Sequence, residues 1–224
     1  MAGVYSQVTT GTEFWSNVFG RSGPVEIEIG PGTGAFLLQE AARRPQVNFV
    51  AIESSRSRAE NLEALVRSRG LTHVRVVHAP AQCVVHHIVP TRSVAAYHIY
   101  FPDPWWKRRH HRRRLLTPAF ARDVARTLVP GGLVAFATDV DFLWTMAIQC
   151  FVGSAGLTLR ELAPPFRRST RTRFEEKGLR RGATIYEGWF ELPAEAKVAA
   201  NAPASTSTCG NSSNVGPTEP AQER

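Results

Sequence analysis

The 224-residue sequence is poor in cysteine, and its few cysteines are badly placed for bonding one another. Cys83, Cys150 and Cys209 are odd in number and far apart, so they predict neither a disulfide framework nor a CxxC zinc site. We therefore expect a reducing compartment and no bound metal.

Signals for export and membrane insertion are also missing. The first twenty residues contain no Lys or Arg and no continuous apolar stretch, so no secretory signal is expected. The best apolar run, over residues 94–101, is interrupted by His98 and falls well short of the roughly 20 residues that span a bilayer. These absences predict a cytoplasmic protein without a membrane segment, and no obligate protein partner is evident.

What the chain does have is concentrated positive charge. The net charge is +8, yet residues 107–114 carry six fixed positive charges without an acid, and residues 167–181 carry a local excess of five. The rest of the chain is therefore slightly acidic. Like charges at this density repel unless a polyanion neutralises them, so the two patches favour nucleic acid over the alternative of a solvated surface.

The composition divides the chain into one domain with a tail. Hydrophobic residues at 43% and aromatic residues at 9% are sufficient for a single packed core. Residues 193–224 contain no aromatic residue, Leu or Ile and are rich in Ala, Pro, Ser, Thr and Asn, a composition typical of disorder. We expect an N-terminal extension over 1–23, the folded domain over 24–192 and a disordered tail over 193–224.

Short apolar segments alternate with helical patterns along the domain. Strands are predicted at 25–29, 48–52, 74–77, 94–101 and 133–137, with further candidates at 157–162 and 183–192. One predicted helix places Leu65 on its inner face and ends near Gly70, and another begins at the cap Thr117 and is stopped by residues 130–132. This alternation predicts an α/β fold, a doubly wound, mostly parallel Rossmann-like sheet of about seven strands with helices on both faces.

Polar motifs follow four of the predicted strands. They are residues 28–34 (EIGPGTG), Glu53, residues 101–105 (FPDPW) and residues 138–139 (TD). Ligands of such sheets bind outside the carboxyl ends of the strands, and these ends share one edge. We therefore expect the four motifs to lie together.

The glycine motif indicates an adenosyl ligand. Gly30, Gly32 and Gly34 lie between a strand and a helix and let a ligand approach the backbone, while Glu53 can accept hydrogen bonds from ribose hydroxyls. Dinucleotides and S-adenosylmethionine both fit this pattern. The GxGxG spacing, preceded by Glu28 as a partner for a cationic methionine end, favours S-adenosylmethionine.

The motif after the fourth strand carries a more specific signal. Two prolines fix the backbone around the carboxylate of Asp103 and place Trp105 beside it, and the basic run starts two residues later at Lys107. One loop thus offers a carboxylate, stacking rings and phosphate contacts, which suits the holding of an extruded purine.

Together these motifs resemble the bacterial tRNA (guanine-N7-)-methyltransferase family over about residues 24–192. The resemblance rests on EIGPGTG from Glu28, FPDPWWKRRHHRRRL from Phe101, ATD from Ala137 and TRFE from Thr172, in this order. It implies a methyl transfer from S-adenosylmethionine to N7 of a guanine in tRNA.

The resemblance also implies a role for each matching residue. Asp103 would be the catalytic acidic residue. S-adenosylmethionine would be bound by Glu28, Gly30, Gly32, Gly34, Glu53 and Pro80. The guanosine would be contacted by Lys107, Asp139, Thr172 and Glu175, and the tRNA backbone by Arg109, His110, Arg112, Arg113 and Arg114.

Two residues depart from the family pattern. Pro80 stands where an acidic or amide residue usually holds the adenine, and it offers neither a side-chain acceptor nor a backbone N–H. Either a neighbour such as Gln82 substitutes for it, or cofactor affinity is reduced. Trp106 replaces a smaller polar or His residue, which we interpret as harmless and as an extra stacking ring.

Three alternatives stay open at this point. Pro80 motivates a non-catalytic RNA-binding module that keeps the methyltransferase fold. A nicotinamide dehydrogenase would explain the glycines but not the basic loop, and the chain lacks a Tyr-x-x-x-Lys pair. An amino-methyltransferase acting on DNA also has an Asp-Pro-Pro-aromatic turn, but the order Pro-Asp-Pro-Trp and the basic run disfavour it.

Overall fold

The computed structural model describes residues 10–160, 175, 180 and 182–194. The strands within them are β1 (Val25–Ile29), β2 (Asn48–Glu53), β3 (Val74–His78), β4 (Val94–Tyr100), β5 (Leu128–Thr138), β6 (Thr158–Arg160) and β7 (Tyr186–Glu191). The helices are α1 (Gly11–Phe19), α2 (Ala35–Arg43), α3 (Arg56–Ser68), α4 (Ala81–His87), α5 (Pro118–Thr127) and α6 (Asp141–Ile148). A 3-10 helix covers Arg108–Arg113, and a π-helical turn follows α6 at Gln149–Ser154.

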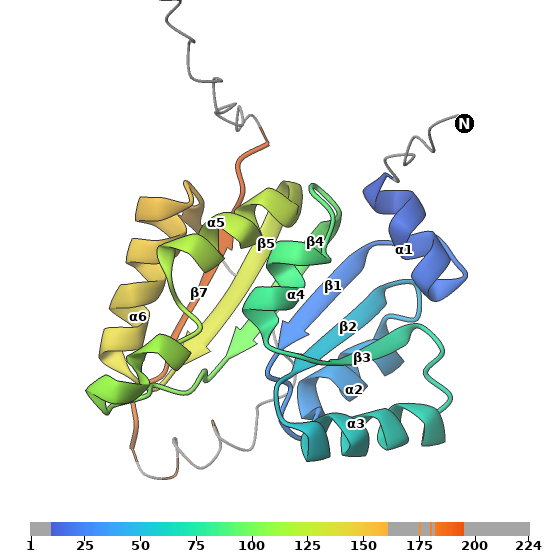
Figure 1. The fold of residues 1–224 in the computed structure, drawn as a ribbon, viewed down its shortest axis with the longest axis horizontal. Helices are drawn as coiled ribbons and strands as arrows, with labels where there is room; N and C mark the ends of the chain where they lie inside the picture. The colour runs from blue at the N-terminus through green and yellow to red at the C-terminus, as the bar shows by residue number, and fades with distance from the viewer. Residues whose placement is uncertain (1–9, 161–174, 176–179, 181, 195–224) are drawn as a thin grey trace, which may run out of the picture.

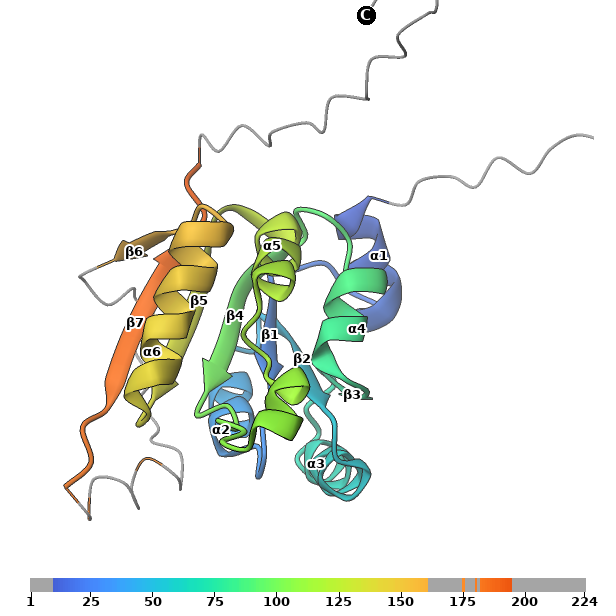
Figure 2. The ribbon, with the colours of Figure 1, turned by 60° about the vertical axis from the view of Figure 1, so that its left-hand side comes forward.

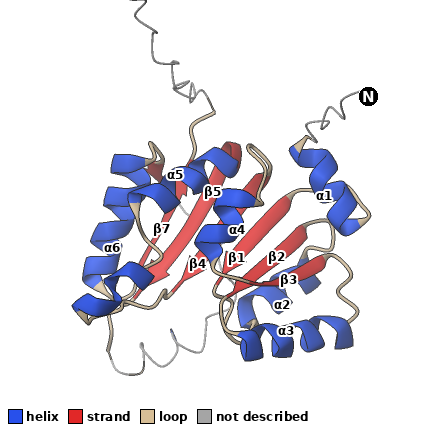
Figure 3. Cartoon of the chain, viewed as in Figure 1, coloured by secondary structure: helices blue, strands red, loops and turns tan. Residues whose placement is uncertain are grey.

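The strands form one sheet in the order β3-β2-β1-β4-β5-β7-β6 (Figures 1 and 3, with β6 labelled in Figure 2). Strands β1 to β5 run parallel, β7 is antiparallel to β5, and β6 is antiparallel to β7. The predicted doubly wound, mostly parallel sheet is confirmed. Because the chain order reverses between β1 and β4, a crevice for a ligand is expected at the carboxyl ends of these two strands.

The alternation of side chains along the strands separates two apolar layers. Ile27 and Ile29 of β1 belong to the core cluster that includes Phe120 of α5, whereas Phe49 and Ala51 of β2 pack with α2 and α3. Helices α4, α5 and α6 line one side of the sheet (Figures 1 and 2). Helices therefore cover both faces, as the sequence predicted.

The end of α5 and the start of β5 differ from the prediction. The helix begins as expected at Thr117, whose Oγ1 accepts from the Phe120 N–H at 3.1 Å, but it ends at Thr127. Residues 130–132, expected to stop the helix, lie inside β5. Gly131 N–H donates to the Leu192 carbonyl at 2.8 Å, and Leu192 N–H donates to the Gly132 carbonyl at 2.9 Å. This pairing with a distant segment draws the turn residues into the sheet.

Smaller differences concern single segments. Leu65 was expected on the inner face of α3 but is 39% exposed, because Leu62 and Val66 supply the buried stripe. The strand candidate at 157–162 is seen as β6, and its last two residues lie outside the described ones. The candidate at 183–192 is seen as β7.

Helix α1 lies within the segment expected to be an N-terminal extension. Thr10 Oγ1 accepts from the Glu13 N–H at 3.3 Å, and Trp15 and Phe19 are buried in the same cluster as Val25. The T-x-x-E spacing of a capping box is the signal that could have revealed this helix. The division into extension, domain and tail stays a prediction, and most of the tail lies outside the described residues.

A buried charged cluster joins β1 and β4 to Arg44, the residue directly after α2. Glu26 accepts from Arg44 at 2.6 and 2.8 Å, and its Oε2 lies 2.9 Å from Nε2 of His98. Burial alone would raise the pKa of Glu26, but the hydrogen bonds and charges of His98 and Arg44 lower it to about 2. The cluster keeps a carboxylate ionised inside the sheet.

Among the helices that the structure describes, none is both long and apolar enough to cross a membrane.

Candidate active site

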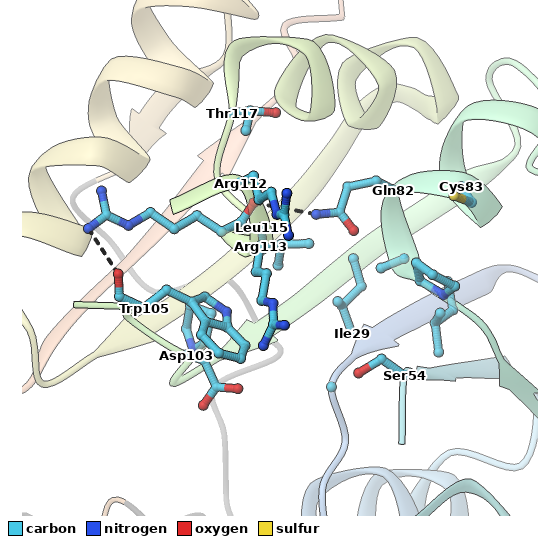
Figure 4. A pocket seen from close by; sticks show the side chains of 16 residues that line it. Ile29, Ser54, Gln82, Cys83, Asp103, Trp105, Arg112, Arg113, Leu115 and Thr117 are labelled. Atoms are coloured by element: carbon cyan, nitrogen blue, oxygen red, sulfur yellow. Dashed lines mark hydrogen bonds between the residues drawn. The ribbon is translucent and has the colours of Figure 1, made fainter. Parts of the chain in front are cut away.

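A cavity of about 690 Å³ opens at the carboxyl ends of β1, β2 and β4. Its wall includes Gly30 after β1, Ser54 after β2, Pro80 before α4 and Asp103 after β4. Asp103 and Trp105 lie on one side of it, with Ile29 and Ser54 on the opposite side (Figure 4). The cavity is therefore at the reversal of strand order, where the fold predicts a ligand.

The three glycines of the first loop differ in what surrounds them. All have positive φ, from +56° to +73°, which a glycine adopts at no steric cost. A Cβ atom on Gly30 or Gly32 would meet nothing within 4 Å, whereas one on Gly34 would lie 2.3 Å from Cδ1 of Leu62. Gly30 and Gly32 thus leave open space for a ligand, and Gly34 allows the start of α2 to pack against α3.

The two predicted cofactor carboxylates are buried at strand ends. Glu28 lies in β1 beside Ala51 of β2 and His98 of β4. Glu53 ends β2, and its Oε1 accepts from the Ser55 N–H at 2.8 Å and from Arg58 at 3.1 Å. These two bonds orient the Glu53 carboxylate at the rim of the sheet, although neither glutamate is part of the cavity wall itself.

The loop that carries Asp103 has a strained backbone. Phe101 and Trp105, which flank the Pro102-Asp103-Pro104 segment, have φ values of +50° and +46°. They are two of the three non-glycine residues with positive φ in the described part of the chain. Such conformations cost about 1 to 3 kcal/mol each and persist only where the surroundings enforce them. The exposed Asp103 carboxylate is therefore presented by a rigid turn.

Arg114 holds this turn through two hydrogen bonds to its backbone. Its Nε donates to the Pro104 carbonyl at 3.0 Å and its Nη2 to the Trp105 carbonyl at 3.4 Å. The same guanidinium lies 5.0 Å from the ring centroid of Phe142 in α6. Arg114 thus joins the Asp103 loop to α6, a role that the sequence analysis did not assign to it.

The other basic residues of the segment are more open to solvent. Lys107, Arg109, Arg112 and Arg113 are exposed, and His110 is half-buried with its ring 5.6 Å from that of Trp105. The Arg113 guanidinium lies 5.1 Å from the Trp105 ring centroid, and both Arg112 and Arg113 line the cavity. The 3-10 helix therefore presents its cations both to the cavity and to the surface.

Of the other residues predicted to contact the guanosine, the structure describes Asp139 and Glu175 but not Thr172. Asp139 follows β5 and is half-buried, beyond the cavity wall. Glu175 is buried, and Thr172 lies outside the described residues. Their contacts with a substrate therefore stay predictions.

The cavity wall also includes Gln82, which the sequence offered as a substitute for Pro80, and three residues that the sequence did not indicate as sites, Ser54, Cys83 and Thr117. Ser54 directly follows Glu53, so its position next to a motif residue was the available signal. Within the described residues, no three His, Cys, Asp or Glu side chains are grouped in a way that would hold a metal ion.

Comparisons with known proteins bear on the family and the fold. Residues 22–188 match a family model described as "Putative methyltransferase". The crystal structure of 16S rRNA methyltransferase KamB has a TM-score of 0.58 at 18% identity, covering 84% of this chain and 95% of that one. The family match places the chain in the class of methyltransferases, and the structural likeness shows the shared fold.

Curated relatives narrow the class to a family. A tRNA (guanine-N(7)-)-methyltransferase of Burkholderia vietnamiensis is 35% identical over 80% of this chain and 71% of that protein. One from Myxococcus xanthus is 43% identical over 56% of this chain and 61% of its own length. The chain belongs to the bacterial tRNA (guanine-N7-)-methyltransferase family, which confirms the resemblance noted in its motifs.

Proposed function

We propose that this protein transfers the methyl group of S-adenosylmethionine to N7 of a guanine in tRNA. The observation that carries the proposal is the shared cavity, whose wall combines the Gly30 turn, the Asp103 carboxylate and the arginines 112–114. The relatives' names add support, since both are tRNA (guanine-N(7)-)-methyltransferases. The cytoplasmic location expected from the sequence is part of the proposal.

The cofactor side of the cavity fits S-adenosylmethionine. Open space above Gly30 and Gly32 lets a ligand reach the backbone, and the volume is typical of small-molecule sites. Glu53 would accept from the ribose hydroxyls, and Glu28 would stand near the methionine end. When bound, the cofactor supplies an electrophilic sulfonium methyl group.

Gln82 would offset the missing acceptor at Pro80. Both residues line the same wall, and the Gln82 amide donates from Nε2 to the Arg114 carbonyl at 3.4 Å. That bond occupies the amide N–H group of Gln82, so its carbonyl oxygen is the atom that would accept from the adenine amino group.

The substrate side suits a reaction controlled by alignment. Guanine N7 carries an in-plane lone pair and no proton, so its attack needs no strong general base. Asp103, held by the strained turn, would accept from the N–H groups of the guanine and stabilise the positive charge that develops on the ring. Lys107 and Asp139 would complete the guanosine contacts.

Nucleoside analysis tests this assignment. The protein would be incubated with tRNA and methyl-labelled S-adenosylmethionine, and the digested nucleosides analysed by mass spectrometry. We expect label in 7-methylguanosine. Label on another base, or on DNA alone, would contradict the substrate, and binding of tRNA without any transfer would support the non-catalytic RNA-binding alternative.

A further inference from the structure

We propose that Trp106 is a platform on which an unpaired base of the bound RNA stacks, outside the cavity that holds the target guanine. The inference rests on RNA being the substrate, as proposed above. Trp106 is not part of the cavity wall, so it is assigned to a nucleotide other than the one that is methylated.

The exposure of Trp106 is unusual for its type. With 66% of its surface open, it exceeds the other large hydrophobic side chains that the structure describes as exposed, and it is the one aromatic residue among them. A large apolar ring held in water is unfavourable for the isolated protein, because the removal of apolar surface from water is favourable. One exposed apolar residue is ordinary on a protein surface, so the role of this ring follows from how it is held and from the charges beside it.

The Trp106 ring packs against Phe142 of α6. Trp106 and Phe142 make an edge-to-face contact with their centroids 5.0 Å apart and their planes at 67°. Phe142 is itself packed by the Arg114 guanidinium at 5.0 Å, and Arg114 holds the carbonyls of the two residues before Trp106. Because Phe142 can cover at most one face of the indole, at least one face is not used by this contact.

The surroundings identify the occupant by charge. Trp106 directly precedes the exposed Lys107, Arg108 and Arg109, and no acidic residue occurs between Asp103 and Asp123. Proteins bind single-stranded nucleic acid by combining two kinds of contact. Cations contact the phosphate backbone, and a neighbouring aromatic ring stacks against a base. A protein segment of apolar character would not need the dense cations, so we assign the ring to RNA.

Substitutions at Trp106 separate stacking from packing and from charge. Because Trp106→Ala removes one stacking contact with a base, we expect it to bind tRNA about 5- to 150-fold more weakly than wild type. Trp106→Leu, which keeps apolar contact with Phe142, should lose affinity similarly, whereas Trp106→Phe should retain most of it. Because no phosphate contact is removed, the slope of log K against log salt should stay at the wild-type value in all three.

Heparin and a second exposed apolar residue provide the controls. Heparin presents anionic groups without bases, so its affinity should be equal in wild type and Trp106→Ala. Ile88 is 54% exposed and follows α4 at the end away from the cavity, so its truncation is a matched control. Ile88→Ala should bind tRNA as wild type does. Quenching of tryptophan fluorescence by tRNA should be smaller in Trp106→Phe than in wild type.

The outcomes distinguish this inference from the proposed function. Wild-type tRNA affinity in Trp106→Leu, or an equal loss of tRNA and heparin binding in Trp106→Ala, would overturn the platform even if 7-methylguanosine is formed. A wild-type protein that binds tRNA through Trp106 but methylates no guanine would leave the platform standing and overturn the proposed reaction.

Discussion

The Nε atom of Arg114 donates to the backbone carbonyl of Pro104 at 3.0 Å, which fixes an arginine of the basic run onto the loop that presents Asp103. Arg112, two residues earlier, is exposed at the cavity rim. Neighbouring arginines therefore have different surroundings, and we expect different functions.

Replacement of Arg114 should affect turnover as well as binding. Arg114→Ala removes two hydrogen bonds that hold a strained turn, so kcat should fall at saturating tRNA because Asp103 is no longer held in place. Arg112→Ala should instead raise KM and flatten the salt dependence of tRNA binding by about 0.7 to 0.9 if it contacts one phosphate. Steady-state kinetics at several salt concentrations test both, and an unchanged kcat in Arg114→Ala would exclude the positioning role.

Asp103→Asn should abolish methyl transfer with little loss of cofactor binding. The amide keeps the size of the side chain but removes the negative charge that would stabilise the methylated ring. Single-turnover assays and calorimetric titration with S-adenosylmethionine provide the two measurements. Comparable loss of both would place Asp103 in the cofactor site.

Gly30→Ala and Gly34→Ala form a matched pair. Both place a Cβ on a backbone with φ near +70°, which costs about 1 kcal/mol in either variant. Only Gly34→Ala also collides with Leu62, so its melting temperature should fall further. Gly30→Ala should fold but bind S-adenosylmethionine weakly. Equal melting temperatures would show that α2 and α3 adjust around the added methyl group.

Gln82→Ala should weaken S-adenosylmethionine binding, because Pro80 supplies no polar side chain of its own. Loss of one net hydrogen bond corresponds to about 2- to 13-fold in affinity. Cys83→Ala is the control, since Cys83 lines the same wall with a thiol that hydrogen-bonds only weakly. If both variants bind like wild type, the adenine does not depend on this wall for a side-chain acceptor.

Stability in acid should depend on Glu26. Its pKa is about 2 in the folded protein against an ordinary value of 4.5, so its stabilising contribution is complete above about pH 4.5 and is lost as the pH falls toward 2. The shift corresponds to about 3 kcal/mol of unfolding free energy. Glu26→Gln should be less stable at pH 7 and lose less stability below pH 4.5. Denaturant unfolding at several pH values measures this, and parallel profiles would contradict it.

Local sequence signals were sufficient to predict the strands and the motifs that follow them. Strand β1 has the predicted limits, β4 differs by one residue and Thr117 caps α5, because apolar runs and capping side chains act over a few neighbouring residues. The glycine loop and the Asp103 turn also follow their strands as expected, since parallel strands place their carboxyl ends at one edge.

Contacts between residues far apart in the sequence decided the features that were not predicted. Residues 130–132 join β5 because they pair with Leu192, sixty residues later in the chain, and a local turn signal carries no information about that partner. Sequence by itself determined that a run of arginines follows Asp103. Tertiary structure decided that Arg114 turns inward to the Pro104 carbonyl and Phe142, because the direction of a guanidinium depends on which acceptors and rings the fold brings within its reach.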